Sequence, residues 1–508
     1  MAERLKRYIR YGWGLAILLP WLIYFHFHYR FSFNYETDIA GQYYLAWTLP
    51  VLVAALFFYL WQQKAPCLTA SIMNVVLIAG LCFSLLFSTY YSFANEHFFV
   101  CCAIYFLMAS LYFFKIDIGA IHLLIILFVS FFVYQLYIGF EQYITEAAYA
   151  QNIALALKGS LQNSGIYGCY LAIHLPWLYY LLVEWKPERL RRGRRTRLFF
   201  GEGLGVRSVL FMLIASVTVF LIIKTQSRTA YIALFGCIAA KSFIVWGGWL
   251  KRKISSISTL AKAALIIFSI SITGVVVWYL FAMKKMSAMG RLMKLRITAD
   301  HICDDFWLGT GPGRFTWYYP QWQAEYFATH SNAPESYFLS AGESYIIFNE
   351  YVQLFKEIGF VGFVAFVGLL VYFFSARSGT HKRTLDALKL TMITILSCGF
   401  TSYPFHVNIF LLMMCFCFVS AAVLRENVTR LNARFATKWR KVILAGLITL
   451  VAITGYKGIK QLNAVQHWLQ LTNGADQDMA TTYESLYNDL KNDGKFLTEY
   501  GIYLSTDS

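Results

Sequence analysis

The sequence is poor in charged residues. Only 14% of its 508 residues are charged, whereas 58% are hydrophobic. A water-soluble domain usually carries about a quarter charged residues, so this composition argues against a soluble globular protein. The apolar runs also lack the alternation at every second residue that is typical of transmembrane β-strands. These two absences leave an all-α polytopic integral membrane protein as the predicted fold class.

Disulfide, metal and nucleic-acid chemistry also lack support in the sequence. The ten cysteines lie mostly within apolar runs, and only Cys303 falls in a predicted outer loop, so we expect no disulfide framework. His301 has acidic neighbours, but the pattern is that of an exposed polar helix face. The net charge of +17 lies mostly in short loops between apolar runs, which favours orientation in a membrane over nucleic-acid binding.

The apolar runs predict about thirteen membrane-spanning helices. Runs such as Val209–Ile223 are free of charge, and about 20 apolar residues suffice to cross a ~30 Å hydrocarbon core. The first run lacks a following small-residue cleavage site, so we interpret it as a mature helix and not as a signal peptide. The predicted spans are residues 8–26, 42–61, 71–91, 97–114, 118–138, 166–184, 208–224, 229–249, 261–282, 358–376, 386–402, 406–424 and 441–456.

Charge in the connecting loops predicts the orientation. Basic residues concentrate on the cytoplasmic side of membrane proteins. With a cytoplasmic N-terminus, thirteen spans place the basic loops on the inner side, among them segment 185–207 and the turn Lys251–Lys253. The first outer loop instead carries Glu36 and Asp38. We therefore expect the C-terminus to lie on the outer face.

Outer segments divide the chain into predicted units. Residues 1–456 form a membrane domain, and the largest outer loop, residues 283–357, is inserted in it. The tail, residues 457–508, is predicted to form amphipathic helices on the outer face, similar to the start of a tetratricopeptide-like repeat array. Helical-repeat surfaces often bind polypeptides, so the tail favours a polypeptide partner.

An arginine stands at an unusual place in this topology. Arg228 lies at the outer mouth of an apolar hairpin, on the side where basic residues are rare. A misplaced arginine in such a hairpin indicates a functional site, and an anion is its natural ligand. The alternative is an arginine that reaches outward to lipid headgroups.

Glycine-rich and polar turns interrupt the apolar pattern at other outer positions. Gly309–Phe315 permits a tight turn whose exposed N–H groups either face an anion or cap a helix. Gly159–Gly165 is either a polar turn at the same face or a simple helix cap. Asn349–Gly362 predicts an amphipathic helix that enters the membrane, with Glu350 and Glu357 two turns apart.

The order of these motifs resembles the O-antigen ligase family, which includes lipid-linked oligosaccharide ligases, bacterial protein O-oligosaccharyltransferases and relatives of the O-antigen polymerases. With the span pattern, the resemblance covers roughly residues 40–425. The similar segments are Gly159–Ala172, Ser227–Ala230, Gly290–Phe315 and Asn349–Gly362.

The resemblance implies a GT-C-like glycosyltransferase of the bacterial inner membrane, with its site on the periplasmic face. It implies an undecaprenyl-diphosphate-linked glycan donor and no metal, nucleotide sugar or other cofactor. Arg228 and Arg291 match the family's diphosphate-binding arginines, and fixed guanidinium groups stabilise a diphosphate leaving group. The other residues expected at the site are Arg296 and Arg314 for the diphosphate, and Asn163, Asn349 and Tyr351 for the glycan or acceptor.

The sequence departs from the family at one position. Phe348 stands where the family has a histidine that is assigned to acceptor activation, and phenylalanine cannot accept a proton. Three explanations stay open. Another base serves, with Glu350, Glu357 and His330 as candidates; leaving-group stabilisation supplies most of the rate; or the protein binds without catalysing.

The predicted function is therefore glycan transfer from the lipid-linked donor to a hydroxyl of lipid A–core or of a Ser or Thr in a secreted protein. An O-antigen-type polymerase is the nearest alternative. A transporter or flippase of lipid-linked sugars is the rival from another class. It predicts internal repeats and charges near the membrane midplane. The sequence shows no clear repeat and most spans lack central charges; Lys241 is an exception, but it lies nearer one span end than the other.

Overall fold

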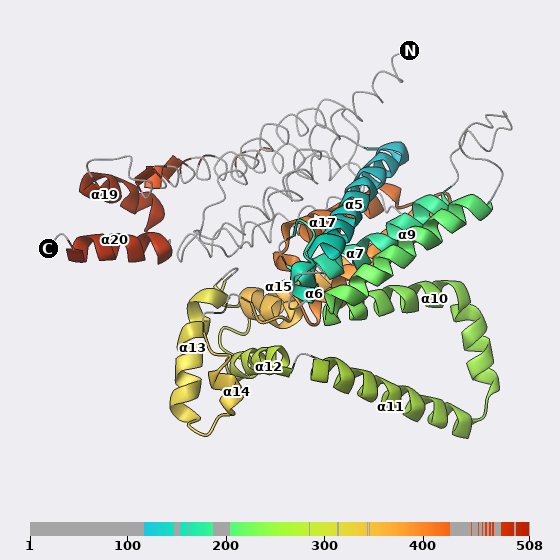
Figure 1. Ribbon diagram of the computed structural model, residues 1–508, viewed down its shortest axis with the longest axis horizontal. Helices are drawn as coiled ribbons and strands as arrows, with labels where there is room; N and C mark the ends of the chain where they lie inside the picture. Colours follow the sequence, from blue (N-terminus) through green and yellow to red (C-terminus); the bar gives the residue numbers. More distant parts are fainter. Residues whose placement is uncertain are drawn as a thin grey trace, which may run out of the picture.

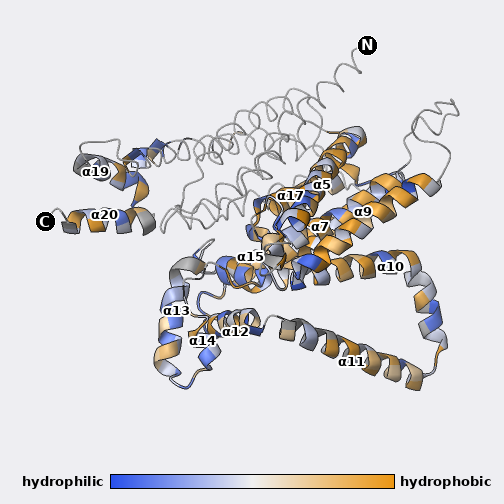
Figure 2. Cartoon of the chain, viewed as in Figure 1, coloured by the Kyte–Doolittle hydropathy of each residue, from blue (hydrophilic) through white to orange (hydrophobic). Residues whose placement is uncertain are grey.

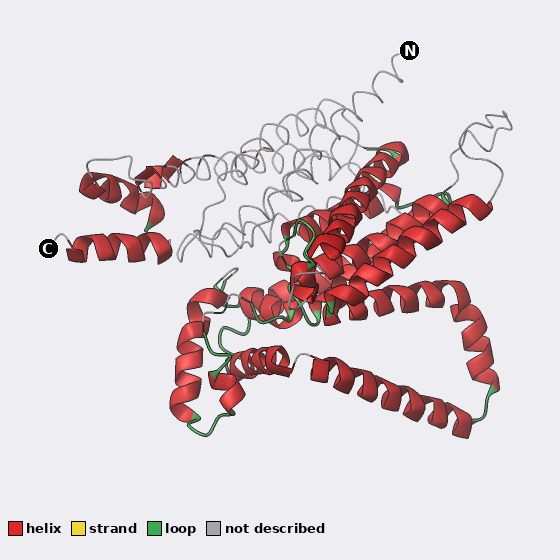
Figure 3. Cartoon of the chain, in the orientation of Figure 1, coloured by secondary structure: helices red, strands yellow, loops and turns green. Residues whose placement is uncertain are grey.

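The part of the chain that the computed structural model describes is built from helices and the loops between them (Figure 3). It comprises residues 116–146, 153–161, 163–185, 204–283, 285–311, 314–342, 344, 346–426, 479–491 and 494–506, with single positions between 445 and 471. The predicted spans at 8–26, 42–61, 71–91 and 97–114, and most of 441–456, lie outside the described residues.

Five helices are long and apolar enough to cross a membrane, and each lies at a predicted span. They are α5 (Ile118–Glu146), α7 (Ser164–Tyr179) with its π-helical extension η1 (Tyr180–Glu184), α9 (Leu204–Thr225), α10 (Arg228–Ser256) and α15 (Glu350–Phe374). Helices also form at three further predicted spans, as α11 (Thr259–Met283), α16 (Lys382–Gly399) and α17 (Asn408–Leu424). This part of the chain is therefore that of a helical membrane protein with several spans.

Helix α7 lies at the centre of the bundle. It packs against α5, α9, α10 and α16, and every residue from Ile166 to Leu178 is buried. A helix that is apolar on all sides is stable only when surrounded by other helices or lipid. By contrast, α9, α10 and α11 expose large apolar side chains such as Leu213, Phe235 and Trp278, as lipid-facing helices do (Figure 2).

Two helices begin at polar residues in segments that the sequence analysis had singled out. The side chain of Asn163 accepts a hydrogen bond from the backbone N–H of Ile166 at the start of α7. Ser227 accepts from Ala230 at the start of α10 in the same way. Both satisfy backbone donors that a helix start leaves without a partner. The helix-cap interpretation of the Gly159–Gly165 region is thus confirmed.

The segment predicted as the large outer loop, residues 283–357 (called the outer loop below after that prediction), forms a small helical unit beside the start of α15 (Figure 1). It contains α12 (Lys285–Asp300), α13 (Phe315–Thr329) and the short α14 (Glu335–Phe338). These helices surround a core separate from that of the bundle, and its buried members are Met293, Ile297, Phe315, Tyr319, Trp322 and Ile347. A 3-10 turn, η2 (Pro404–His406), joins α16 to α17, and the tail contributes α19 (Met479–Leu490) and α20 (Gly494–Thr506).

A glycine contact joins this loop to the membrane helix. Helix α15 is interrupted at Gly359, whose φ of 64° and ψ of −175° leave the helical region. The N–H groups of Thr310 and Gly311 donate to the carbonyls of Lys356 and Glu357, both at 2.9 Å. In return, the first N–H groups after the break donate to carbonyls of the turn, Phe360 to Phe306 and Val361 to Trp307.

These four bonds decide between the two interpretations of the glycine-rich turn. Its N–H groups at 310 and 311 are used by α15, so the turn caps the break in that helix and does not face an anion there. Pro312 and Gly313 of the motif lie outside the described residues. Gly309 and Gly359 both have positive φ and lie backbone to backbone, which explains why glycine occupies both positions.

We predict that Gly359→Ala lowers the free energy of unfolding by at least ~2 kcal/mol. The added methyl group would lie 2.5 Å from the backbone N of Gly309, and the positive φ is strained for alanine. Thermal denaturation of the purified protein in detergent measures the effect. Gly368→Ala in the same helix is the control, because nothing lies within 4 Å of the methyl group it adds. Equal loss of stability in both variants would contradict the backbone contact.

Candidate functional site

Three basic side chains form what we term the cationic cluster: Arg228, Arg291 and Lys294. Arg228 is the first residue of α10, and the other two lie one turn apart on α12. The guanidinium of Arg228 donates to the hydroxyl of Ser287 at 3.3 Å, which joins the start of α10 to α12. Two arginines that are 63 positions apart in sequence are therefore neighbours, as the motifs predicted.

The segment between α16 and η2, residues 400–403, holds the cluster together. The backbone carbonyl of Thr401 accepts a hydrogen bond from Nη1 of Arg291 at 2.6 Å and another from the hydroxyl of Thr229 at 3.3 Å. The side-chain amide of Asn349 donates to the carbonyl of Phe400 at 3.4 Å. The starts of α10 and α15, together with α12, are thus fixed to one short segment.

The start of α7 lies on the same side of the bundle. The hydroxyl of Ser227 donates to the carbonyl of Gly165 at 3.2 Å, so the α7 cap and the arginine hairpin are in contact. The side-chain oxygen of Asn163 accepts the capping hydrogen bond from the N–H of Ile166. Tyr351 lies at the first turn of α15, and its hydroxyl donates to the carbonyl of Leu396 on α16 at 2.6 Å.

The aromatic ring of Phe348 packs against two members of the cluster. Its ring centroid lies 4.5 Å from Cζ of Arg291 and 4.9 Å from Nζ of Lys294. The ring also meets Tyr403 edge-on at 5.5 Å. Its φ of 63° is unusual for a residue with a bulky side chain. The strained backbone therefore presents an aromatic face to two cations, an attractive arrangement.

The buried cluster is electropositive at neutral pH. Burial, and then the nearby charge of Arg228, lower the pKa of Arg291 to about 10, so this guanidinium remains protonated at neutral pH. Burial and the charge of Arg291 lower the pKa of Lys294 to about 8. The N-terminal ends of α10 and α15, which carry partial positive charge, begin at the same place. An anion with two or more charges is the ligand that this environment favours.

The two predicted carboxylates of α15 lie elsewhere, inside the protein. Glu350 is 2% exposed, accepts a hydrogen bond from the N–H of Phe405 at 2.7 Å, and lies 3.0 Å from Nδ1 of His406. Glu357 is also buried and accepts from the amide of Gln353. Glu350 thus holds the η2 turn against the start of α15.

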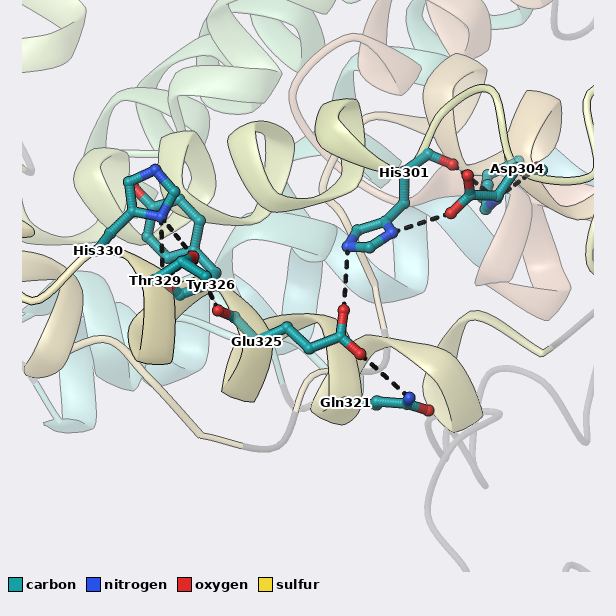
Figure 4. A network of polar contacts seen from close by, with 8 residues as sticks. His301, Asp304, Gln321, Glu325, Tyr326, Thr329 and His330 are labelled. Atoms are coloured by element: carbon teal, nitrogen blue, oxygen red, sulfur yellow. Dashed lines mark hydrogen bonds and ion pairs between the residues drawn. The ribbon is translucent and has the colours of Figure 1, made fainter.

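The remaining predicted residues lie in the outer loop. Arg296 is exposed and pairs with Asp300 at 3.7 Å, while Arg314 donates to the carbonyl of Thr310 in the glycine turn. His330 ends α13, where its ring stacks on Tyr326 at 4.3 Å and meets the hydroxyl of Thr329 (Figure 4). The structure therefore brings Arg228, Arg291 and Asn349 together but gives Arg296 and His330 partners within the loop.

A second polar network in this loop fixes α12 to α13. Glu325 accepts a hydrogen bond from Gln321 and lies 3.9 Å from Nε2 of His301, whose Nδ1 meets Asp304 at 2.9 Å (Figure 4). The buried ammonium of Lys356 on α15 donates to the carbonyls of His301 and Asp304. These contacts hold the end of α12 over the membrane helix, and with it the cationic cluster.

Thr401 and Lys294 were missed by sequence reasoning. Thr401 acts through its backbone carbonyl, so its residue type does not indicate this role, although the polar pair Thr401-Ser402 ends the predicted span 386–402. Lys294 lies one helical turn after Arg291, a spacing that places both on one face of a helix. This spacing could have predicted that Lys294 belongs to the same site as Arg291.

We predict that Glu350→Ala lowers the free energy of unfolding by about 3–5 kcal/mol, because it leaves the buried His406 and the N–H of Phe405 without their acceptor. Chemical or thermal denaturation in detergent checks this. Glu335→Ala, an exposed acid on α14, is the matched control and should change stability by less than ~0.5 kcal/mol. A similar loss in both variants would argue against the role of Glu350 in holding η2.

Comparison with known proteins agrees with these motifs. The family model described as O-antigen ligase matches residues 210–367, a segment that runs from α9 into the second half of α15 and contains the whole cationic cluster. No curated protein matches the chain. Residues 210–367 thus match the O-antigen ligase family, and the resemblance predicted from the order of the motifs is confirmed for this segment.

Proposed function

We propose that this protein transfers a glycan from an undecaprenyl-diphosphate-linked donor to an acceptor hydroxyl on the periplasmic face of the bacterial inner membrane. The match to the O-antigen ligase family supports glycan transfer of the ligase or polymerase type. The observation that carries the finer proposal is the pair Arg228 and Arg291, brought together from two helices at the start of a membrane span.

The charge of the cluster matches that of the donor. A diphosphate diester carries two negative charges, and it gains a third as the bond to the sugar breaks. Two fixed guanidinium groups stabilise this developing charge more than they stabilise the intact donor, and that difference lowers the barrier. Arg291 is held by a backbone carbonyl and an aromatic ring, so its position does not depend on the ligand.

The lipid chain of the donor has an apolar surface beside the cluster. Helix α10, which begins with Arg228, and α11 expose several large apolar side chains, among them Phe235, Ile238 and Trp278. Figure 2 shows these helices with hydrophobic residues along their length. A polyprenyl chain that lies along α10 would place its diphosphate at the helix start, where Arg228 stands.

Two acceptor classes follow from different observations. The family match favours lipid A–core. The tail favours a polypeptide, because α19 and α20 pack on a common core with Trp468 and so form a helical unit of the kind that binds chains. Comparing lipid A–core and secreted proteins between the wild type and a deletion strain identifies the acceptor by which of them loses its glycan.

We predict that Arg228→Ala and Arg291→Ala each reduce transfer by roughly 10²-fold or more. Arg291→Lys should restore little of the lost activity, because an ammonium lacks the planar fork of donors that binds a diphosphate. Transfer is measured with purified protein, undecaprenyl-diphosphate-linked glycan and the acceptor identified in the deletion strain. Arg252→Ala, in the last turns of α10, is the control. Wild-type rates in both alanine variants would refute the proposed function.

A further inference from the structure

Lys294 is the member of the cationic cluster that the diphosphate does not require. It lies on the face of α12 that carries Arg291, and its ammonium contacts the ring of Phe348 at 4.9 Å. Within the described part of the chain, no hydrogen bond or ion pair to another residue holds its Nζ. The side chain is partly exposed, so a ligand at the cluster can reach it.

We propose that Lys294 is the proton acceptor for the hydroxyl that attacks the sugar, a role that rests on the glycan transfer proposed above. The geometry supports it through position: Lys294 and Arg291 contact the same aromatic ring. The proposed base thus stands one helical turn from the arginine that would hold the leaving diphosphate, close to the sugar whose bond to that diphosphate breaks.

The step balances without any further reactant. The acceptor oxygen forms a bond to the anomeric carbon, and the bond from that carbon to the phosphate oxygen breaks with its electron pair on the diphosphate. The hydroxyl proton passes to the neutral amine of Lys294, which becomes an ammonium. The ammonium releases this proton to water after the products leave. The products are therefore the glycoside, undecaprenyl diphosphate and one proton.

The neutral amine is accessible at physiological pH. Burial and the charge of Arg291 lower the pKa of Lys294 to about 8, so roughly a tenth of the amine is unprotonated at pH 7 and about half at pH 8. The two negative charges of the bound donor are matched by the two guanidinium groups. The donor therefore does not fully cancel the lowering of the pKa of Lys294. Arg228 on α10 and Tyr403 before η2 act on the neighbouring Arg291. The titratable groups on the helices that pack against α12 are Lys262 and Tyr279 on α11, Tyr318, Tyr319, Glu325 and Tyr326 on α13, and Glu335 and Tyr337 on α14.

The carboxylates and the histidine predicted for this role are less well placed. Glu350 and Glu357 are buried and accept hydrogen bonds from protein groups. His330 lies at the end of α13 and stacks on Tyr326. Among these groups and Lys294, only Lys294 contacts the ring that also contacts Arg291.

A kinetic test separates a base from a binding cation. Lys294→Arg keeps the charge but cannot lose its proton in the working pH range. We expect it to reduce kcat by roughly 10²-fold or more with little change in KM for the donor. In the wild type, kcat/KM should rise with pH through about 8, because the neutral amine is the active form. Lys285→Arg, an exposed lysine on α12, is the control.

A chemical test needs neither donor nor acceptor. Reductive methylation of the purified full chain at a series of pH values, followed by mass spectrometry, gives the pKa of Lys294. The expected midpoint is about 8, and Arg291→Met should raise it because a neighbouring positive charge is removed. A midpoint near the ordinary value of about 10.5 would overturn the proposal.

The outcomes distinguish this inference from the proposed function. An active Lys294→Arg enzyme, together with inactive Arg228→Ala and Arg291→Ala, overturns the role of Lys294 and leaves glycan transfer in place. Active arginine variants overturn glycan transfer at this site, whatever the methylation midpoint. A lowered midpoint with an inactive Lys294→Arg variant that still binds undecaprenyl diphosphate supports both.

Discussion

The backbone carbonyl of Thr401 is the contact on which the site depends. It accepts hydrogen bonds from Arg291 and from Thr229, and so joins the outer loop to the start of a membrane span. A carboxylate at this place would have paired with Arg291 and neutralised it. A carbonyl orients the guanidinium and leaves its charge for a ligand, which is what an anion site requires. A buried cation held in this way is costly, and its surroundings must offset part of that cost.

Several weak interactions supply that offset. The ring of Phe348 offers its negative face to both Arg291 and Lys294. Within the same cluster the basic groups repel one another, and each lowers the affinity of its neighbour for a proton. A bound diphosphate relieves this repulsion. Burial and the repulsion from Arg291 together lower the pKa of Lys294, and the same repulsion favours binding of an anion at the empty site.

Apolar runs predicted the described helices well, because spans require long uninterrupted apolar stretches whatever their partners. Arg228, Arg291 and the cap residues Asn163 and Asn349 were also accessible to sequence reasoning, since their residue types are informative at those places. The glycine turn was ambiguous: whether its N–H groups face an anion or a helix depends on a partner 46 residues away. The burial of Glu350 was hidden for a similar reason, as its partners Phe405 and His406 lie 55 and 56 residues away in the sequence.

The glycine contact between the loop and α15 has a mechanical consequence. Four backbone hydrogen bonds cross at the one point where α15 has no continuous helix of its own. The half of the helix beyond Gly359 can change its tilt only by turning about this point, and the turn at 306–311 must move with it. Tilting is one way in which a spanning helix accommodates a mismatch with the thickness of the bilayer. The thickness of the bilayer around α15 therefore affects the conformation of the loop and, through α12, the distance between Arg228 and Arg291.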